Sequence, residues 1–268
     1  MDEYVSGRRL YGDDFTGEAL AEWYRLEATR YVDMTRARGG PYRYQYHALN
    51  ELHTWSRLPP GRRFERVLGM GSAWGDEFTP ILHRIGHITL ADVADEYEQH
   101  NVAGVPVRVV KPGMAGELPV ESGSFDLVVC FAALQHVAAV TRAVREMARC
   151  VAPDGFLCLR DGIAANRFHE RVLQGGPASP RGIPSAILED IVRGTGLRLV
   201  HSDYQMFPPL RKLWARLLRS ELYLSPVGVW LDWVLSRLFL WNYRYHATSR
   251  WHHLRPTSRT FVLHRPAA

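Results

Sequence analysis

The stretch at residues 66–76, Arg-Val-Leu-Gly-Met-Gly-Ser-Ala-Trp-Gly-Asp, constrains the fold more than any other part of the chain. A short apolar run ending at Leu68 is typical of a buried strand. Small residues follow at every second position: Gly71, Ala73 and Gly75. They let the backbone turn sharply and approach a ligand closely. A helical pattern then runs from Gly75 to about residue 85. Strand, glycine turn and helix together predict the nucleotide-binding corner of a doubly wound α/β fold.

The residues around this turn also favour one cofactor over another. In the dinucleotide pattern G-x-G-x-x-G the third glycine would fall at position 76, where the chain has Asp76 followed by Glu77. Two carboxylates would repel a pyrophosphate at the helix N-terminus. S-adenosylmethionine carries a ribose, no phosphate and two cationic groups. Asp92, at the end of the next apolar run, can accept hydrogen bonds from both ribose hydroxyls. The turn therefore favours S-adenosylmethionine and argues against a nicotinamide oxidoreductase.

Two further stretches resemble the class I S-adenosylmethionine-dependent methyltransferases. Residues 117–137 contain Leu-Pro and then Phe-Asp-Leu-Val before a helix, and residues 145–159 contain Arg-Cys-Val-Ala-Pro-Asp-Gly before a strand. The resemblance covers residues 64–204, with a closing strand near 259–264. It implies a doubly wound, Rossmann-like α/β fold whose seven-stranded sheet has an antiparallel last strand.

The resemblance also implies where the cofactor binds. It assigns cofactor contacts to Gly69, Gly71, Ser72, Gly75, Asp76, Asp92, Val93, Met114, Ala115 and Phe131. Gly69 stands where the family usually has an acidic residue for the ligand's ammonium, and Asp76 or Glu77 can take that role. Met114 stands where the family often has an Asp on the adenine amine, and it can only pack against the ring.

An aromatic stretch before the first strand, residues 42–47, offers a further contact. In related enzymes an N-terminal segment folds over the cofactor, where Arg43 can hold a carboxylate. Packing of a cap helix explains the stretch equally well.

Methyl transfer is an in-line displacement, so the protein mainly positions and desolvates the reactants. A hydroxyl acceptor also needs a base. His136 follows the fourth strand and is expected to face the transferred methyl, either as that base or as a residue that closes the pocket. Asp161, at the end of the fifth strand, can bind an acceptor hydroxyl or amine, or cap a helix. Phe131 occupies the position where catechol-type enzymes have a metal-binding Asp, and no His/Cys/Asp/Glu cluster has ligand spacing, so no metal is expected.

The sequence pattern predicts two parts, a helical cap at 1–60 and a methyltransferase domain at 61–268. Strands are expected near 66–70, 87–92, 105–110, 125–131, 155–160, 197–204 and 259–264, with helices at 17–38, 44–55, 140–151 and 185–194. Cys130, Cys150 and Cys158 fall inside these elements, which argues against a disulfide frame or a zinc site. The N-terminus lacks the pattern of a signal peptide, so a cytoplasmic location is expected.

A helical insertion is expected at about 206–256, between strands six and seven. It has two apolar stripes, and five of the eight Trp residues lie between 214 and 251. Asp232 and Arg237 interrupt the second stripe, so it is no membrane span. The segment can be a lid or extra core, a homodimer face, or a membrane-surface patch. Leaving about a dozen large apolar side chains in water costs roughly 1.5–3 kcal/mol each, so the stripes are expected to cover the sheet, a partner subunit or a lipid surface. A lid on the acceptor side is the expectation, because a segment between strands six and seven can reach the ligand edge of the sheet.

The predicted function is S-adenosylmethionine-dependent methylation, at oxygen, of a glycan or small-molecule acceptor. Pieces such as residues 42–50 resemble bacterial methyltransferases associated with cell-surface polysaccharide or secondary-metabolite assembly. The residues after strand four, Phe-Ala-Ala-Leu, lack the Asp/Asn-Pro-Pro-Tyr pattern of DNA adenine methylation, so no nucleic-acid partner is expected. The alternative is a non-catalytic protein that keeps the fold and uses the Trp-rich insertion for contacts.

Overall fold

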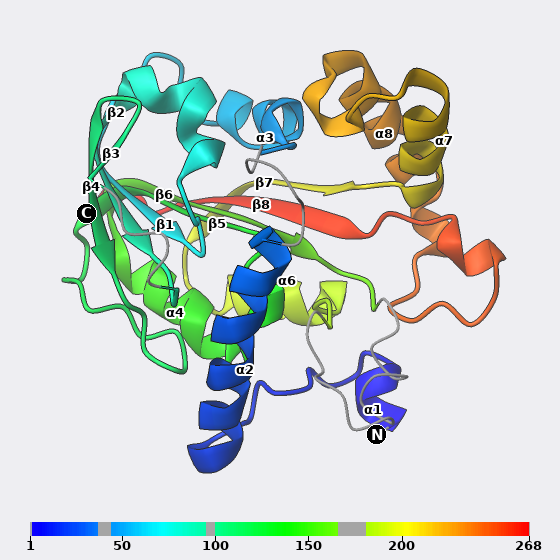
Figure 1. The fold of residues 1–268 in the computed structure, drawn as a ribbon, viewed down its shortest axis with the longest axis horizontal. Coiled ribbons are helices and arrows are strands. Elements are labelled where there is room, and N and C mark those ends of the chain that lie inside the picture. The colour runs from blue at the N-terminus through cyan, green and yellow to red at the C-terminus, as the bar shows by residue number, and fades with distance from the viewer. Residues whose placement is uncertain (1, 37–43, 95–99, 166–180, 268) are drawn as a thin grey trace.

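The protein, described here from a computed structural model, is built on one mixed β-sheet with helices on both faces (Figure 1). The structure describes residues 2–36, 44–94, 100–165 and 181–267. The strands are β1 Phe64–Met70, β2 Ile85–Ala91, β3 Asn101–Val102, β4 Val105–Val110, β5 Phe125–Phe131, β6 Val151–Gly162, β7 Arg198–Gln205 and β8 Ser258–His264. Their order across the sheet is β3-β4-β2-β1-β5-β6-β8-β7.

The sheet has the order expected of a doubly wound fold. Strand β1 pairs in parallel with β2 and β5, and β8 runs antiparallel to both β6 and β7. The expectation of seven strands is one short, because the two residues of β3 pair antiparallel with β4 at the sheet edge. The central strand β5 is buried along almost its whole length because helices cover both faces.

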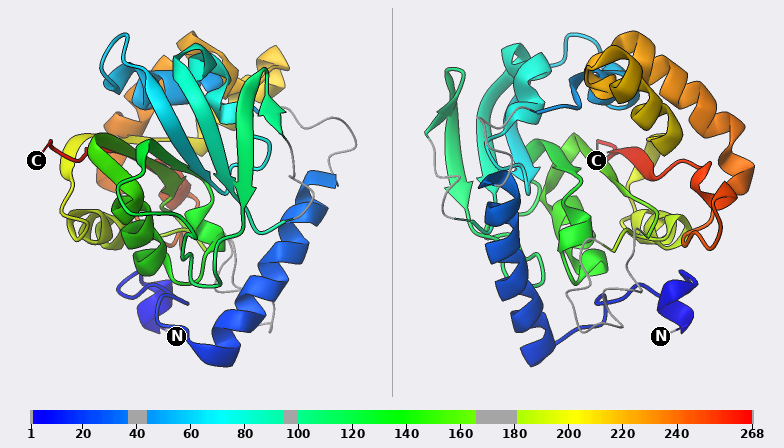
Figure 2. Two further views of the ribbon diagram at one scale, coloured as in Figure 1. Left: turned by 90° about the vertical axis from the view of Figure 1, so that its left-hand side faces the viewer. Right: turned by 45° about the vertical axis from the view of Figure 1, so that its right-hand side comes forward.

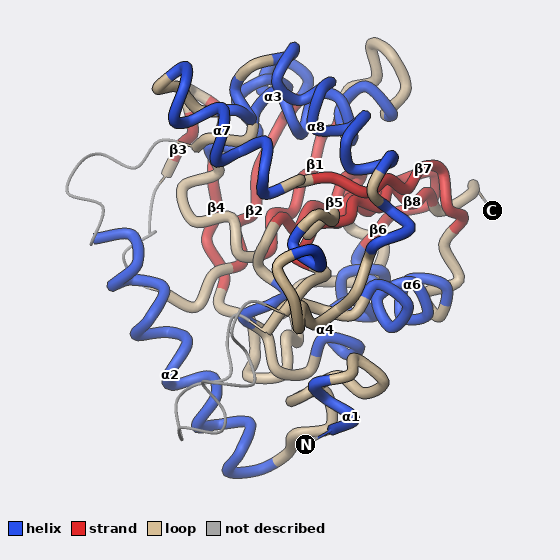
Figure 3. The backbone as a smooth tube through the Cα atoms, turned by 90° about the vertical axis from the view of Figure 1, so that its right-hand side faces the viewer, coloured by secondary structure: helices blue, strands red, loops and turns tan. Residues whose placement is uncertain are grey.

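The helices form two layers around the sheet. One layer holds α4 Val140–Cys150 and α6 Ser185–Arg193, and the opposite layer holds α3 His47–His53, α7 Pro208–Leu218 and α8 Pro226–Leu238 (Figure 3). Short 3₁₀ segments complete the described part of the chain: η1 Trp55–Arg57, η2 Asp76–Arg84, η4 Leu134–His136, η5 Leu222–Leu224, η6 Leu240–Asn242 and η7 Trp251–His253. Near the N-terminus, α1 Asp2–Val5 leads to α2 Gly17–Arg36, which runs alongside the strand ends (Figure 2).

The helix expected after the glycine turn is present in an altered form. Residues Asp76–Arg84 form the 3₁₀ helix η2, which starts after Gly75 in the left-handed conformation. Pro80 lies inside it, and proline lacks the N–H that a regular α-helix needs. The apolar spacing predicted a helical segment, and the proline changes its hydrogen bonding.

The segment from 206 to 256 packs differently from the expectation of a lid with both stripes covered. Helix α8 packs on β7 and α3 through a narrow face of Gly228, Val229, Asp232 and Ser236. Helix α7 has no buried residue, and the Leu217 side chain is 68% exposed. The outward faces of both stripes are therefore not covered by the described residues of this chain, so cover by a partner subunit or a lipid surface stays a prediction. No described helix is long and apolar enough to cross a membrane.

Candidate functional site

The glycine turn after β1 has little room for side chains. Gly71 has φ +63°, and a Cβ on it would lie 2.4 Å from the Cβ of Ala133. A Cβ on Gly69 would lie 2.4 Å from the Ser72 Oγ. Both distances are far below van der Waals contact, so glycine is required at each position. This packing accounts for Gly69 in place of the acidic residue that the family resemblance suggested.

A buried carboxylate stands at the end of β2. The Asp92 Oδ2 accepts the Ala73 N–H at 3.2 Å, and Oδ1 accepts the Ala94 N–H at 3.2 Å. The side chain is buried, and loss of hydration raises the pKa of its carboxyl group. These bonds link the glycine turn to the β2 end and aim the carboxylate into the space between them.

A cavity opens at the same place, at the carboxyl ends of β1 and β2. Five predicted site residues line it together: Gly71, Asp92, Val93, Met114 and His136. The Met114 side chain is half exposed, in keeping with a residue that packs on a flat ligand.

Helix α2 closes this cavity from the outside. The Trp23 Nε1 donates to the His136 carbonyl at 2.8 Å, and the Tyr24 hydroxyl donates to the Pro112 carbonyl at 3.3 Å. Trp23, Tyr24 and Glu27 all line the cavity. Helix α2 thus contributes to the cavity wall, whereas no residue of the 206–256 segment lines the cavity.

Glu27 also contacts the predicted base. Its Oε2 lies 2.8 Å from the His136 Nδ1, and both side chains are mostly buried. A carboxylate at Nδ1 favours the tautomer with the proton on Nδ1 and the lone pair on Nε2. The contact holds the His136 ring at the cavity wall.

The buried Arg181 contacts the residues that directly follow His136. Its Nη2 donates to the carbonyls of Val137 and Ala138 at 2.9 Å each, and the guanidinium lies 4.9 Å from the Trp23 ring centroid. Burial lowers the pKa of Arg181 to about 10, so it stays charged at neutral pH. Arg181 therefore positions the turn that carries His136.

The charges of the cavity decide which ligand suits it. Its walls include the carboxylates of Asp92 and Glu27, and no Lys or Arg is among the described residues that line it. A pyrophosphate would have no Lys or Arg partner among these described residues. The groups of S-adenosylmethionine suit these residues better. Asp92 can accept from a ribose, Met114 can pack on an adenine, and the carboxylates of Asp92 and Glu27 favour its cationic groups.

Other predicted cofactor residues lie behind the cavity wall. Ser72, Gly75 and Ala115 are buried and Asp76 is half-buried, and none of these four nor Gly69 lines the cavity. The Phe131 ring lies 5.5 Å from the Trp55 ring and 5.1 Å from the Arg160 guanidinium, so it supports the strand ends. Arg43 lies outside the described residues.

Asp161 is buried beside η4, the 3₁₀ turn that carries His136. Its Oδ2 accepts the Leu134 N–H at 2.8 Å and its Oδ1 accepts the Gly162 N–H at 2.8 Å. Burial raises the pKa of Asp161 to about 6. It does not line the cavity, so its predicted contact with the acceptor stays a prediction and its described role is to hold the His136 turn.

One cluster could not be anticipated from spacing along the chain. His53 on α3 comes together with His201 and Asp203 on β7, with one ligand atom of each within 4.8 Å of the others. The Asp203 carboxylate also accepts hydrogen bonds from Trp233 and Arg237 of α8. The cluster could hold a metal ion and lies apart from the cavity residues. The expectation that no cluster has ligand geometry rested on sequence spacing, which does not reveal it.

The glycine turn, the carboxylate after β2 and the capped cavity define the class as a Rossmann-like methyltransferase fold. Residues 68–159 match the family model described as "Methyltransferase domain". An uncharacterized methyltransferase of Bacillus subtilis, YcgJ, is 32% identical over 110 residues, covering 38% of this chain and 43% of YcgJ. The chain thus aligns with less than half of that relative. Over residues 68–159 the chain is therefore similar to methyltransferases.

Two solved structures have a similar fold at low sequence identity. The [4+2]-cyclase SpnF has a TM-score of 0.58 and 15% identity, covering 94% of this chain and 97% of that one. A Haemonchus contortus phosphoethanolamine N-methyltransferase, in complex with phosphomonomethylethanolamine and S-adenosylhomocysteine, has a TM-score of 0.56 and 17% identity, covering 97% of this chain and 61% of that one. At these identities the likeness shows the fold alone.

Proposed function

We propose that this protein transfers a methyl group from S-adenosylmethionine to an oxygen of a small-molecule or glycan acceptor. One observation carries the proposal: Asp92 and the Glu27–His136 pair line the same cavity, with no Lys or Arg among its described lining. A cytoplasmic location, an acceptor made in cell-surface polysaccharide or secondary-metabolite assembly, and the absence of a nucleic-acid partner belong to the same proposal.

Each residue has a role in the proposed reaction. When bound, S-adenosylmethionine supplies a methyl group on a positively charged sulfur. Asp92 holds the ribose hydroxyls, and Met114 packs against the adenine. His136 takes the proton of the acceptor hydroxyl at Nε2, while the Glu27 carboxylate stabilises the resulting imidazolium. Trp23 and Tyr24 exclude water from the cavity, which strengthens these charge interactions.

The cofactor assignment is tested by calorimetric titration of S-adenosylmethionine into the full chain and its Asp92→Ala variant. Hydrogen bonds to charged groups contribute roughly 1.5–3 kcal/mol each, so the variant should bind at least about tenfold more weakly. A folded variant with an unchanged dissociation constant contradicts the assignment. Screening hydroxylated small molecules and glycans with methyl-labelled cofactor then identifies the acceptor, and turnover is expected to withstand EDTA.

The alternative is a non-catalytic protein that uses the 206–256 segment for contacts. The exposed apolar faces of that segment favour it, because no described residue covers them. The two functions separate in the same titration: a non-catalytic scaffold releases no heat with S-adenosylmethionine.

A further inference from the structure

Helices α7 and α8 and the chain that follows them carry most of the exposed large apolar side chains of the molecule. Nine of the thirteen such side chains in the described residues lie between Leu213 and Trp251. Trp241 and Trp251 are each about three-quarters exposed, at 75% and 76%. This concentration exceeds the scattered apolar residues of an ordinary soluble surface.

The same segment holds the chain's positive charge. Residues 206–256 contain eight Lys or Arg and two Asp or Glu, a formal charge of +6, so the rest of the chain carries −1 of the total of +5. One of the two acids, Asp232, is fully buried. Arg255 is buried as well and Arg237 pairs with Asp203, so the exposed positive charge comes from the cations of α7 together with Arg244 and Arg250.

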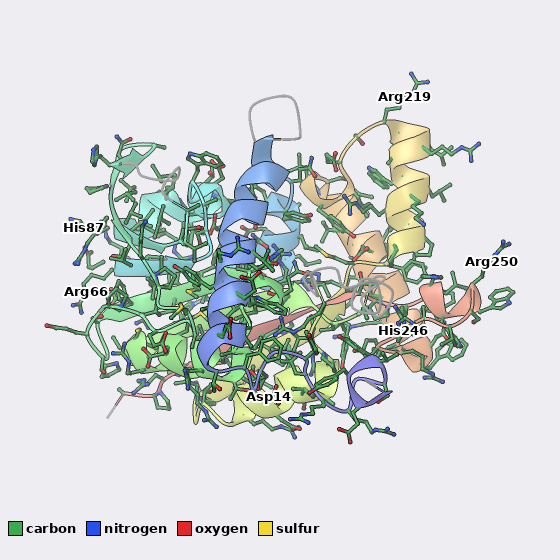
Figure 4. All side chains as sticks on the ribbon, turned by 60° about the horizontal axis from the view of Figure 1, so that its bottom comes forward. Asp14, Arg66, His87, Arg219, His246 and Arg250 are labelled. Atoms are coloured by element: carbon green, nitrogen blue, oxygen red, sulfur yellow. The ribbon has the colours of Figure 1, made fainter. Side chains whose placement is uncertain are left out.

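The basic side chains of α7 are available to a partner. Arg211, Lys212, Arg216 and Arg219 are exposed, and none forms an ion pair within the described parts of the chain. Arg219 at the end of α7 and Arg250 in the following chain point away from the body of the molecule (Figure 4). Leucines of α7 alternate with these cations along the helix: Leu213, Leu217 and Leu218.

All of these elements lie together at the end of the molecule next to β7 (Figures 1 and 2). The cofactor cavity lies at the ends of β1 and β2 under α2. The basic apolar surface is thus a separate feature of the fold.

We propose that the exposed faces of α7, α8 and residues 239–251 form a docking surface for an anionic lipid bilayer. Tryptophan and leucine between arginines are the composition of helices that lie in a membrane interface. Anionic head groups attract Lys and Arg near the surface, and apolar side chains enter the acyl boundary. A second copy of the chain fits this surface poorly, because the exposed cations of two such faces repel each other.

Vesicle binding by the full chain tests this surface directly, and the assay does not depend on methyl transfer. Flotation is measured with vesicles of phosphatidylcholine alone and with vesicles that also contain phosphatidylglycerol. The protein should bind the anionic vesicles at low salt, bind less at high salt, and leave the neutral vesicles free. Absence of binding to anionic vesicles at low salt overturns the proposal.

Two sets of substitutions locate the surface. Changing Arg211, Lys212, Arg216 and Arg219 together to Gln should weaken binding to anionic vesicles at least about tenfold. The matched control changes four exposed arginines elsewhere, Arg63, Arg66, Arg108 and Arg145, to Gln and removes the same charge. The control should bind nearly as the parent does. Equal losses in both variants would show that net charge alone drives binding and would overturn the docking surface.

A double variant, Trp241→Ala with Trp251→Ala, tests the apolar contribution. These side chains are mostly exposed, so folding should be unaffected and vesicle binding should fall several-fold. Light scattering on the same samples reports the oligomeric state. A parent dimer that becomes monomeric in the variant, with vesicle binding unchanged, assigns the surface to self-association and overturns the proposal.

Discussion

Helices α2 and α7 are both amphipathic in sequence, yet the two differ in what their apolar faces meet. In α2 the apolar residues Leu20 and Trp23 are buried, and Trp23 closes the cofactor cavity. In α7 no residue is buried, and Leu217 faces solvent. Apolar periodicity predicts that a helix forms, but the complementary surface it needs is set by the rest of the fold. The α2 face finds that surface within the protein, and the α7 face does not.

The contrast is sharpest for activity. His136→Asn should lower the turnover rate by about 10²–10⁴-fold, because the general base is lost. Glu27→Gln on α2 should give a smaller fall, because the imidazole stays in place while the orientation and charge support of His136 are lost. Lys212→Gln on α7 is the control and should keep full turnover. The measurement is labelled methyl transfer to the identified acceptor.

A stability pair separates the two helices without an acceptor. Leu20→Ala on α2 should lower the free energy of unfolding by about 2 kcal/mol or more, because a buried side chain is removed. Leu217→Ala on α7 should change it by less than about 0.5 kcal/mol. Urea unfolding of both variants gives the two numbers. Equal losses would mean that α7 is covered in solution and would break the comparison.

Stability is expected to depend on pH through Glu77, which is buried in η2 directly after the glycine turn. Burial raises the pKa of Glu77 from 4.5 to about 7. Between these values the unfolded chain releases a proton that the folded protein keeps. The contribution of the Glu77 carboxyl group to the free energy of unfolding is therefore largest below the lower value, and it falls as pH rises. Above the upper value this contribution is gone. The change amounts to at most about 3 kcal/mol.

Glu77→Gln should flatten this decline, measured as the free energy of unfolding at several pH values. The control Glu221→Gln changes an exposed residue of the 206–256 segment and should leave the slope as it is. A Glu77→Gln protein with the parent's slope would show that the Glu77 carboxyl is not desolvated.

Much of the fold could be predicted because it depends on local patterns. The apolar runs of the strands and the glycine turn appear in the sequence with their spacing, and the turn's Gly71 and the Asp92 that follows do line the cavity. The 3₁₀ form of η2 was missed although Pro80 signals it.

The missing parts of the site depend on contacts far apart in sequence. Glu27 lies 109 residues from His136, and no spacing rule links them. The family resemblance assigned residues around each motif, so it included Phe131, which packs against Trp55. Only the fold separates the residues that face the cavity from those one layer behind.

The buried Asp232 has a consequence for how the basic apolar surface would work. Its carboxylate accepts the N–H groups of Met206 and Phe207 at 2.8 Å each, where α7 begins, while its backbone belongs to α8. The two helices are therefore already joined and ordered before any encounter. Amphipathic peptides that are unfolded in water lose backbone entropy of roughly 1–2 kcal/mol per residue when they fold on a membrane. This protein would bind the membrane with both helices already folded. Circular dichroism should therefore report almost no gain in helix when anionic vesicles are added.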